Sequence, residues 1–346
     1  MEYITAGGFN RQAIPPNLRH EAMAMRNALL DDFYALGAPV LTTHDARLMP
    51  PKNHLESIAI TPEIDPLTVW HDLLTRCDAA LIIAPESQDI LIKITQLLEQ
   101  TSVINLGCNS CAVQLTSNKL HTYEHLVTHN IRTIPTYLMA DDTKLSFLPI
   151  HQAYIVKPID GVGCEETWLF NTRDEMQDWR NTAQLQDEKW ICQPYIVGEA
   201  ASFTMLIDNA NPNTKEVRVL SCNSQTIVNQ KVLGKAYHAL SYAGGVVNQH
   251  AALLNELTTL AHQIANSIDG LNGFVGVDVI LHYSPSNILQ AIDVVEINPR
   301  ITTSYVGLHE SLQYNPAQLL LNRLDHSESV LTAKIAAMPI NITLND

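Results

Sequence analysis

Positive charge is scarce and dispersed in this chain of 346 residues. Lys and Arg number 21 against 36 Asp and Glu, giving a formal net charge of -15, and no block of basic residues occurs. A groove for the nucleic-acid backbone needs clustered basic side chains, as does electrostatic attachment to an anionic membrane. We therefore expect no nucleic-acid partner and no membrane partner.

Long apolar runs are absent as well. No stretch approaches the roughly 20 apolar residues that a transmembrane helix requires. The first residues, MEYITAGGFNRQ, lack the basic start and apolar run of a signal peptide. These two absences predict a cytoplasmic protein.

Cysteine is also sparse, with six dispersed residues: Cys77, Cys108, Cys111, Cys164, Cys192 and Cys222. In a reducing compartment, such thiols are typically free rather than paired. Cys108 and Cys111 form a C-x-x-C, but no second Cys or His pair lies at zinc-finger spacing. This pattern favours free thiols over a disulfide framework or a zinc site.

The composition that is present, 46% hydrophobic and 16% charged, is typical of an ordered globular protein with two or three subdomains. Up to residue 110, strands and helices alternate, which predicts a small parallel α/β sheet with an unusually short first strand at EYIT. The other expected elements are helices at 17–36, 65–77 and 89–100, and strands at 38–43, 79–87 and 102–107.

From residue 111 onward, paired strands with interleaved helices predict an α+β architecture. We expect a central subdomain at 111–190 with a glycine-bearing hairpin, a further subdomain at 191–330, and a tail at 331–346. The clearest strands are 189–197, 200–208, 216–223, 225–233, 273–283 and 289–298, and the longest helix is 250–268.

Polar residues interrupt the last two strands in a regular way. Asp278 lies within GFVGVDVILHY, and the stretch DVVEINPRITT places Glu296 and Asn298 on one strand face with Arg300 just beyond. If the two strands pair as a hairpin, three oxygen ligands meet on one face, a donor set that suits Mg²⁺. The alternative is a pair of acids on a solvated sheet face.

Two stretches have features of a nucleotide site. In YIVKPIDGVGCEE, Lys157 ends a strand before a turn with Gly161 and Gly163, whose backbone can approach an anion, although the P-loop pattern is not matched. In CQPYIVGEAASF, the segment from Gln193 to Ile196 can meet the edge of an adenine, and Glu199 the ribose hydroxyls. The alternatives are an ordinary hairpin and a β-bulge with an exposed glutamate.

The stretch SNKLHTYEH supports two different interpretations. Lys119 at a helix start can supply a second cation for phosphate. His121, Glu124 and His125 spell H-x-x-E-H, the inverted zinc-protease motif. That protease would need a third metal ligand, and the sequence offers no evident one.

In order and spacing, these elements resemble the ATP-grasp superfamily from about residue 75 onward. The resemblance implies that Lys119 and Lys157 hold the ATP phosphates under the loop DGVGCE, with Gly161 and Gly163. It also implies that Gln193, Tyr195 and Ile196 read adenine and that Glu199 binds ribose. Asp278, Glu296 and Asn298 would bind two Mg²⁺ ions, with Mn²⁺ an alternative, and Arg300 would meet the γ-phosphate or an acyl phosphate.

A narrower resemblance links EYITAGGFN, LIIAPESQDIL, YAGGVV and EINPRITTSYVGL to the tyramine–glutamate ligases of methanofuran and methylofuran biosynthesis. It implies a ligase that joins L-glutamate to tyramine through an acyl phosphate, with a homodimer left open. Candidates for lining the substrate pocket are Tyr242, Gly244, Gly245, Thr302, Thr303 and Tyr305. Cys164 departs from the glycine or serine expected in the loop. The alternatives are another amino-acid or peptide substrate, or a nucleotide-binding protein without turnover.

Overall fold

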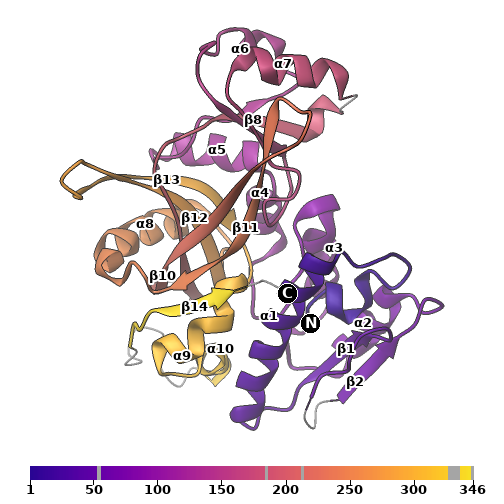
Figure 1. Cartoon of the computed structure of the whole chain (residues 1–346). Coiled ribbons are helices and arrows are strands. Elements are labelled where there is room, and N and C mark those ends of the chain that lie inside the picture. The colour runs from indigo at the N-terminus through magenta and orange to yellow at the C-terminus, as the bar shows by residue number, and fades with distance from the viewer. Residues whose placement is uncertain (53–55, 184–185, 212–213, 326–335, 344–346) are drawn as a thin grey trace.

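The computed structural model describes residues 1–346 except 53–55, 184–185, 212–213, 326–335 and 344–346. Its N-terminal unit, at the lower right of Figure 1, contains two short parallel strand pairs and three helices. β1 (Leu41–Asp45) pairs with β2 (Glu56–Ile60), and β3 (Ala79–Ala80) pairs with β4 (Ile104–Asn105). The helices are α1 (Pro16–Ala35), α2 (Pro66–Leu74) and α3 (Ile90–Glu99).

The strand expected at EYIT does not form. Only a single parallel bridge joins Glu2 to Ile83, and the chain then enters a π-helical turn, Ile4–Gly8. The Glu2 carboxylate accepts hydrogen bonds from the backbone N–H groups of Ile4 at 3.1 Å and Thr5 at 2.8 Å. This capping satisfies the first donors of the turn and draws the chain out of extended geometry.

The strand predicted at 38–43 forms as β1 but is displaced to 41–45, and the strand predicted at 79–87 is shortened to β3. β2 was not anticipated.

The remaining strands form one ten-stranded sheet in the order β13-β12-β9-β10-β11-β7-β6-β8-β5, with β14 paired to β11. Their bounds are β5 Tyr137–Leu138, β6 Tyr154–Pro158, β7 Trp168–Phe170, β8 Trp190–Pro194, β9 Glu199–Asn211, β10 Thr214–Lys231, β11 Tyr237–Val247, β12 Gly273–Tyr283, β13 Leu289–Asn298 and β14 Ile340–Thr343.

The sheet agrees with the predicted pattern in part. β12 and β13 occupy the expected ranges and pair antiparallel, as a hairpin requires. The strands expected at 216–223 and 225–233 are one continuous strand, β10, with a register shift between Gln225 and Ile227. β11 was not anticipated, because its Gly244 and Gly245 are residues that strands usually exclude.

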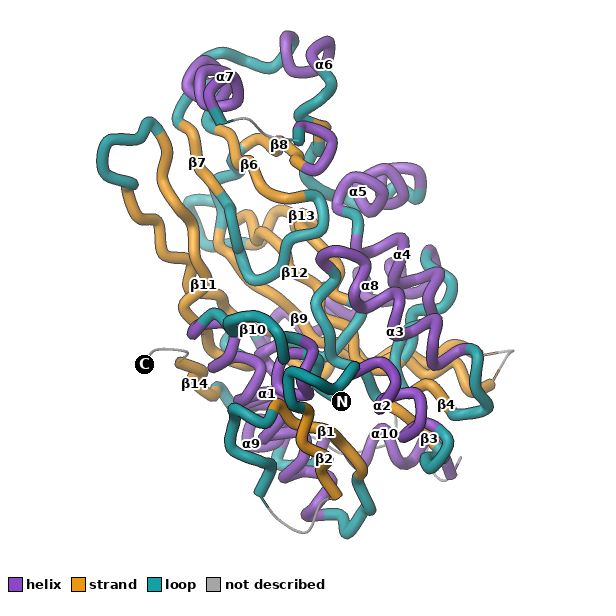
Figure 2. The backbone as a smooth tube through the Cα atoms, turned by 90° about the vertical axis from the view of Figure 1, so that its right-hand side faces the viewer, coloured by secondary structure: helices purple, strands orange, loops and turns teal. Residues whose placement is uncertain are grey.

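Helices cover one face of the large sheet (Figure 2). α4 (Ser110–Ser117) and α8 (Leu254–Ser267) pack on the apolar face of β9, β10 and β12, which contributes Phe203, Met205 and Val277 to the core. α5 (Lys119–Thr128) follows α4 directly. α6 (Asp142–Ser146) and α7 (Arg173–Thr182) share a separate core with β6, β7 and β8.

The other face of the sheet meets the N-terminal unit. α1 packs against the 3₁₀ turn Thr303–Gly307, which follows β13, and against α10 (Pro316–Asp325), with α9 (Leu308–Leu312) in the same core. Because strand residues alternate between faces, Ala200 and Ser202 of β9 point away from the helix-covered core and toward this second face.

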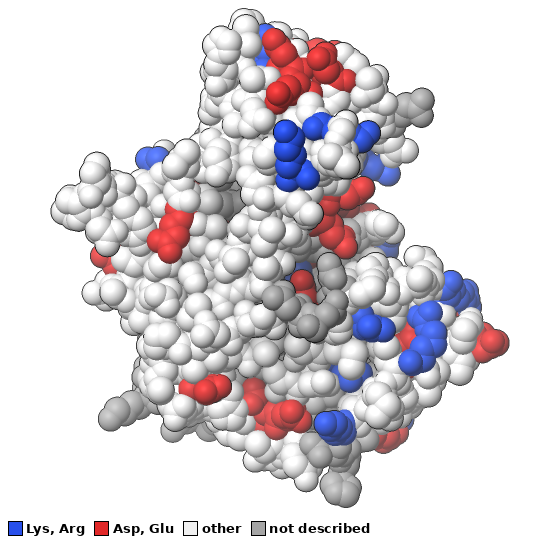
Figure 3. All heavy atoms as spheres, viewed as in Figure 1, with Lys and Arg blue, Asp and Glu red and all other residues white. Residues whose placement is uncertain are grey.

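Surface charge and helix length are two further features of the described structure. On the face drawn in Figure 3, Lys and Arg form small groups separated by acidic side chains. Across the residues that the structure describes, none of the helices has the length and apolarity needed to cross a bilayer.

Candidate active site

A cavity of about 480 Å³ lies on the second face of the sheet. Its walls come from β6, β8, β9, β10, β11, β12 and β13, from the glycine turn after β6, from α1, and from the segment that follows β13. It therefore brings together residues that are distant in sequence, from Glu21 of α1 to Ile342 of β14.

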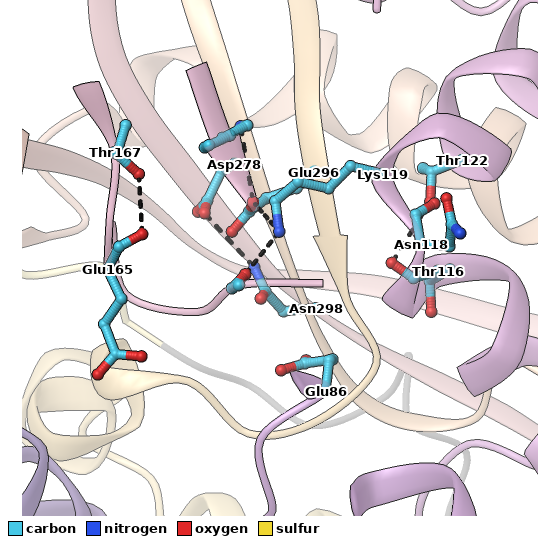
Figure 4. A network of polar contacts seen from close by, with 12 residues as sticks. Glu86, Thr116, Asn118, Lys119, Thr122, Glu165, Thr167, Asp278, Glu296 and Asn298 are labelled. Carbon is cyan, nitrogen blue, oxygen red and sulfur yellow. Dashed lines mark hydrogen bonds and ion pairs between the residues drawn. The ribbon is translucent and has the colours of Figure 1, made fainter. Parts of the chain in front are cut away.

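The three predicted metal ligands meet in this cavity. Asp278 of β12 lies opposite Glu296 of β13, and Asn298 lies opposite Gly276. The amide of Asn298 donates to Asp278 Oδ2 at 3.4 Å (Figure 4). Gln225 Nε2 donates to Asp278 Oδ1 at 2.9 Å. Gly276 leaves space that a side chain would fill, because its Cβ would lie 2.5 Å from Thr302.

Both predicted lysines point at the same carboxylate. Lys119 Nζ lies 3.5 Å from Glu296 Oε2 (Figure 4). Lys157 Nζ lies 4.0 Å from the same oxygen. Lys119 is the first residue of α5, and its position is fixed by Asn118, whose side chain caps the helix by accepting from the N–H groups of Leu120 and His121 at 3.0 Å. Lys119 Nζ also donates to the carbonyl of Gly161 at 2.5 Å, so it links Glu296 of β13 to the glycine turn.

Neighbouring charges shift the pKa values of the two acids in opposite directions. Burial and the neighbouring Glu296 raise the pKa of Asp278. Burial alone would also raise the pKa of Glu296, but the ammonium groups of Lys119 and Lys157 outweigh it and lower that pKa. Burial lowers the pKa of Lys157, and Glu296 opposes this effect. Holding the two acids this close therefore costs free energy, and a bound cation would lower that cost.

The donor set fits Mg²⁺. Two carboxylates and one amide oxygen are hard ligands, and Mg²⁺ needs few of them because it keeps water and phosphate oxygens in its shell. In the described part of the chain, no group of three His, Cys, Asp or Glu side chains is arranged to hold a metal. The described residues therefore do not form a zinc site or another site in which protein side chains supply all the metal ligands.

The glycine turn has an unusual backbone. Gly163 has φ +61°, and Cys164 (φ +61°) and Glu166 (φ +49°) also lie in the left-handed region that favours glycine. Gly161, Gly163 and Cys164 all line the cavity. Burial raises the pKa of the Cys164 thiol to about 12, so this side chain is a neutral group at the cavity wall.

The predicted adenine segment also lines the cavity. Gln193, Tyr195 and Ile196 all contribute to the wall; the Gln193 amide donates to Thr136 Oγ1 at 2.8 Å, and the Tyr195 N–H donates to Ala153 O at 2.8 Å. Glu199 lies between the lining residues Gly198 and Ala200 but is not itself part of the wall. Its carboxylate is 3.2 Å from His250 Nε2.

Arg300 lies in the cavity and is held from the N-terminal unit. Its Nε and Nη2 donate to the two oxygens of Glu86 at 3.0 and 2.9 Å, and both side chains are buried. Two residues after Glu86, the N–H of Gln88 donates to Asp160 Oδ2 at 2.8 Å, at the start of the glycine turn. The loop after β3 therefore contacts two separate parts of the site.

The predicted substrate residues divide into two groups. Tyr242, Gly245, Thr302 and Thr303 line the cavity, whereas Gly244 and Tyr305 do not. Tyr305 is 2% exposed, packs edge-on against Phe274, and donates its hydroxyl to Asp32 at 2.9 Å.

Gly244 has φ +109°, and a Cβ there would lie 2.2 Å from the carbonyl oxygen of Ile342 in β14. Tyr305 and Gly244 thus have structural partners rather than places in the cavity wall.

The competing motifs have structural partners as well. His125 Nε2 contacts the carbonyl of Ser267 at 2.9 Å, and the His125 ring stacks on His129 with centroids 4.1 Å apart. Cys108 is buried against Asn272, Cys111 is exposed, and all six cysteines are free. Neither the H-x-x-E-H stretch nor the C-x-x-C pair gathers metal ligands.

The fold and the cavity together define an ATP-dependent ligase. Residues 116–304 match the ATP-grasp domain and residues 38–113 match the pre ATP-grasp 3 domain, and the chain belongs to the ATP-grasp superfamily. The predicted fold, with small parallel sheets before a large antiparallel one, is confirmed, as is the class of carboxylate–amine ligase. Proteins of this superfamily bind ATP with Mg²⁺.

The comparison with individual proteins is more specific. The chain is 30% identical over 345 residues to the tyramine–L-glutamate ligase of Methanocaldococcus fervens. The aligned residues cover 99% of this chain and 98% of that protein. It is also 30% identical over 334 residues to the tyramine–L-glutamate ligase of Methanocaldococcus jannaschii, covering 94% and 89%. A crystal structure of an ATP-grasp superfamily protein from Archaeoglobus fulgidus matches with a TM-score of 0.65 at 21% identity, covering 99% and 97% of the two chains.

Sequence reasoning missed Glu21 and Gln225, which line the cavity, and Glu86, which holds Arg300. Gln225 is the first residue of the expected strand 225–233, and Glu86 lies near the end of the expected strand 79–87, so a search for polar residues at strand ends would have found both. Glu21 lies within a helix, and nothing in its local pattern distinguishes it from a solvent-facing residue.

Proposed function

We propose that this ATP-grasp ligase joins L-glutamate to tyramine through an acyl phosphate, in the synthesis of a methanofuran-type cofactor. The observation that carries the ligase chemistry is the convergence of Lys119, Lys157, Asp278 and Glu296 on one cavity face. The substrate pair is supported by the two curated relatives, each 30% identical over nearly the whole chain.

In this proposal, the two lysines bind the phosphates of ATP, and the turn with Gly161 and Gly163 covers them. Gln193 with the Tyr195 and Ile196 backbone borders the adenine, and Glu199 reaches the ribose from the edge of the wall. Asp278, Glu296 and Asn298 would hold Mg²⁺, in two ions, and Mn²⁺ suits the same oxygen donors. The bound metal would neutralise charge on the transferring phosphoryl group.

The chain's own residues account for the rest of the chemistry. A carboxylate oxygen of glutamate attacks the γ-phosphorus and ADP leaves, while Lys157 and Arg300 stabilise the charge that spreads over the phosphoryl oxygens. The amine then attacks the acyl carbon, and phosphate leaves. The glycine turn excludes water from the acyl phosphate. No nucleophilic side chain is required, and the neutral Cys164 thiol supplies none.

The part of the cavity that we assign to the substrates, called the substrate half below, has both polar and apolar walls, which suit glutamate and an aromatic amine. Tyr242, Gly245, Thr302 and Thr303 line it with hydroxyl and backbone groups. Met25, Val247 and Ile342 add apolar surface, which suits the ring of an aromatic amine.

The decisive experiment is ADP release from Mg-ATP with L-glutamate and tyramine, together and singly, with product masses recorded. We expect release that needs both substrates and a product with the mass of their amide. Release with a different carboxylate or amine, and none with this pair, would leave the ligase class intact and refute the substrate assignment.

Two variants test the site itself. Lys157→Ala and Glu296→Ala should each abolish ADP release while leaving the circular dichroism spectrum unchanged, because each removes charge that the phosphoryl transfer needs. Lys231→Ala, at the exposed end of β10, is the matched control and should retain activity. Normal turnover in either cavity variant would refute the proposed site.

A further inference from the structure

Glu21 is a carboxylate in the cavity wall that faces the space between α1 and the sheet. It lies on α1, one helical turn before Met25, and both side chains line the substrate half of the cavity. Within the part of the chain that the structure describes, Glu21 makes no hydrogen bond or ion pair. A charged group placed this way loses hydration that only the attraction of Arg300 offsets in part, so it is retained at a cost to stability.

The other charged groups of this region are already matched. Lys119 and Lys157 lie beside Glu296, Gln225 and Asn298 donate to Asp278, and Arg300 is held by Glu86. Glu165, on the glycine turn, also lines the cavity and adds a second negative charge near Glu21. Burial raises the pKa of Glu21 to about 7; Arg300 opposes this shift and Glu165 adds to it. The negative charges of Glu21 and Glu165 therefore exceed the positive charge available to them in this part of the cavity.

The surroundings of Glu21 indicate what kind of cation would fit. Met25, Val247 and Ile342 are apolar, and Tyr242 borders the same space. A second carboxylate would be repelled by Glu21 and Glu165, whereas an ammonium on an apolar body would satisfy the charge and cover the apolar wall. The amino-acid substrate also carries an ammonium, but its two carboxylates would be repelled by Glu21 and Glu165, so it fits this corner less well than a primary amine without a carboxylate.

We propose that Glu21 forms the ammonium subsite for the amine substrate, an arylalkyl or similar primary amine, and takes one proton from it during ligation. This inference rests on the proposed ligase function and names the residue that selects the nucleophile. The ammonium gives one proton to the Glu21 carboxylate, and the nitrogen lone pair forms the bond to the acyl carbon. The carbon–oxygen bond to phosphate breaks, and the second proton leaves with the phosphate.

The test is Glu21→Gln, which keeps the size of the side chain and removes its charge. KM is measured separately for tyramine, L-glutamate and ATP. We expect KM for the amine to rise about tenfold to a hundredfold, the effect of losing one hydrogen bond to a charged group, while the other two change less than about threefold. Asp31→Asn, an exposed acid on the same helix, is the matched control and should change none of them.

A second readout separates charge recognition from a structural effect. Tyrosol, the hydroxyl analogue of tyramine, has the same ring but no ammonium. The wild type should bind tyramine at least about tenfold more tightly than tyrosol, and Glu21→Gln should bring the ratio close to one by weakening tyramine alone. Should Glu21→Gln fold poorly, Glu21→Asp retains the charge and should preserve the preference.

The outcomes are distinguishable from a failure of the substrate assignment. If the wild type makes no glutamate–tyramine amide, that assignment fails, and the same pair of measurements is made with the amine that supports ADP release and its hydroxyl analogue. An unchanged KM for the amine, or a rise confined to KM for the amino acid, overturns the role of Glu21. No ADP release with any amine overturns both proposals.

Discussion

Replacing Glu86 with glutamine should destabilise the protein by about 3 kcal/mol. Glu86 accepts two hydrogen bonds from Arg300 at 3.0 and 2.9 Å, and the side chains are only 6% and 12% exposed. Removing one member of a buried pair typically costs about 3–5 kcal/mol, because the remaining charge stays buried without compensation. Glu21 and Glu296 also attract Arg300, which places our expectation at the lower end.

The assay is thermal unfolding followed by circular dichroism. With an unfolding entropy of about 2.1 cal/mol/K per residue, a loss of about 3 kcal/mol corresponds to a fall in Tm of about 4 °C for a chain of 346 residues. In 0.5 M NaCl the difference should persist, because a buried pair is poorly screened. Asp31→Asn again serves as the control, since Asp31 is exposed on α1.

A double-mutant cycle separates the pair from its surroundings. Glu86→Gln with Arg300→Gln removes both charges, so its loss of stability should be smaller than the sum of the two single losses by about 2 kcal/mol. Additive losses, or a Tm in Glu86→Gln within about 2 °C of the wild type, would refute the reasoning that this ion pair joins the N-terminal unit to the end of β13.

Three further outcomes are expected. Because burial raises the pKa of Glu21 from 4.5 to about 7, its charged form destabilises the ligand-free protein as pH rises through that interval. Glu21→Gln should thus be more stable than the wild type by about 1–3 kcal/mol at pH 8 and nearly equal at pH 4.5, measured by urea unfolding; a difference independent of pH would contradict this. Gly244→Ala should cost about 2 kcal/mol or more, since a Cβ there would lie 2.2 Å from the Ile342 carbonyl, whereas Gly107→Ala, with its nearest neighbour at 3.5 Å, should be nearly neutral in Tm. Tyr305→Phe should lose about 1–2 kcal/mol with its hydrogen bond to Asp32 and leave KM unchanged for both substrates; a raised KM would mean that Tyr305 reaches the substrate.

The hairpin of β12 and β13 was predictable because its information is local. Apolar residues flank Asp278 and Glu296 on strands that are neighbours in sequence, so alternation and pairing together bring the two acids to one face. The glycine turn after Lys157 is equally local. The placement of Asp278, Glu296 and Lys157 around one cavity was therefore predictable from the sequence, although Gln225, at the start of an expected strand, was overlooked.

The contacts of Glu21 and Glu86 were not predictable, because they join distant parts of the chain. Glu86 meets Arg300 across 214 positions, and no periodicity records such a pairing. The first strand failed for a different reason: the side chain of Glu2 caps the following turn, which overrides the strand propensity of its neighbours. β11 was missed because its two glycines, needed for the close approach of β10 and β14, resemble a loop.

The convergence of Lys119 and Lys157 on Glu296 has a consequence for entropy. A free lysine side chain samples many rotamers, and fixing one costs about 1.5–2 kcal/mol at room temperature. Here both side chains are nearly buried and already directed at one carboxylate, so that loss occurs when the chain folds. A polyphosphate that enters the cavity therefore meets two cations whose conformational freedom is already gone, and its binding free energy need not cover that ordering.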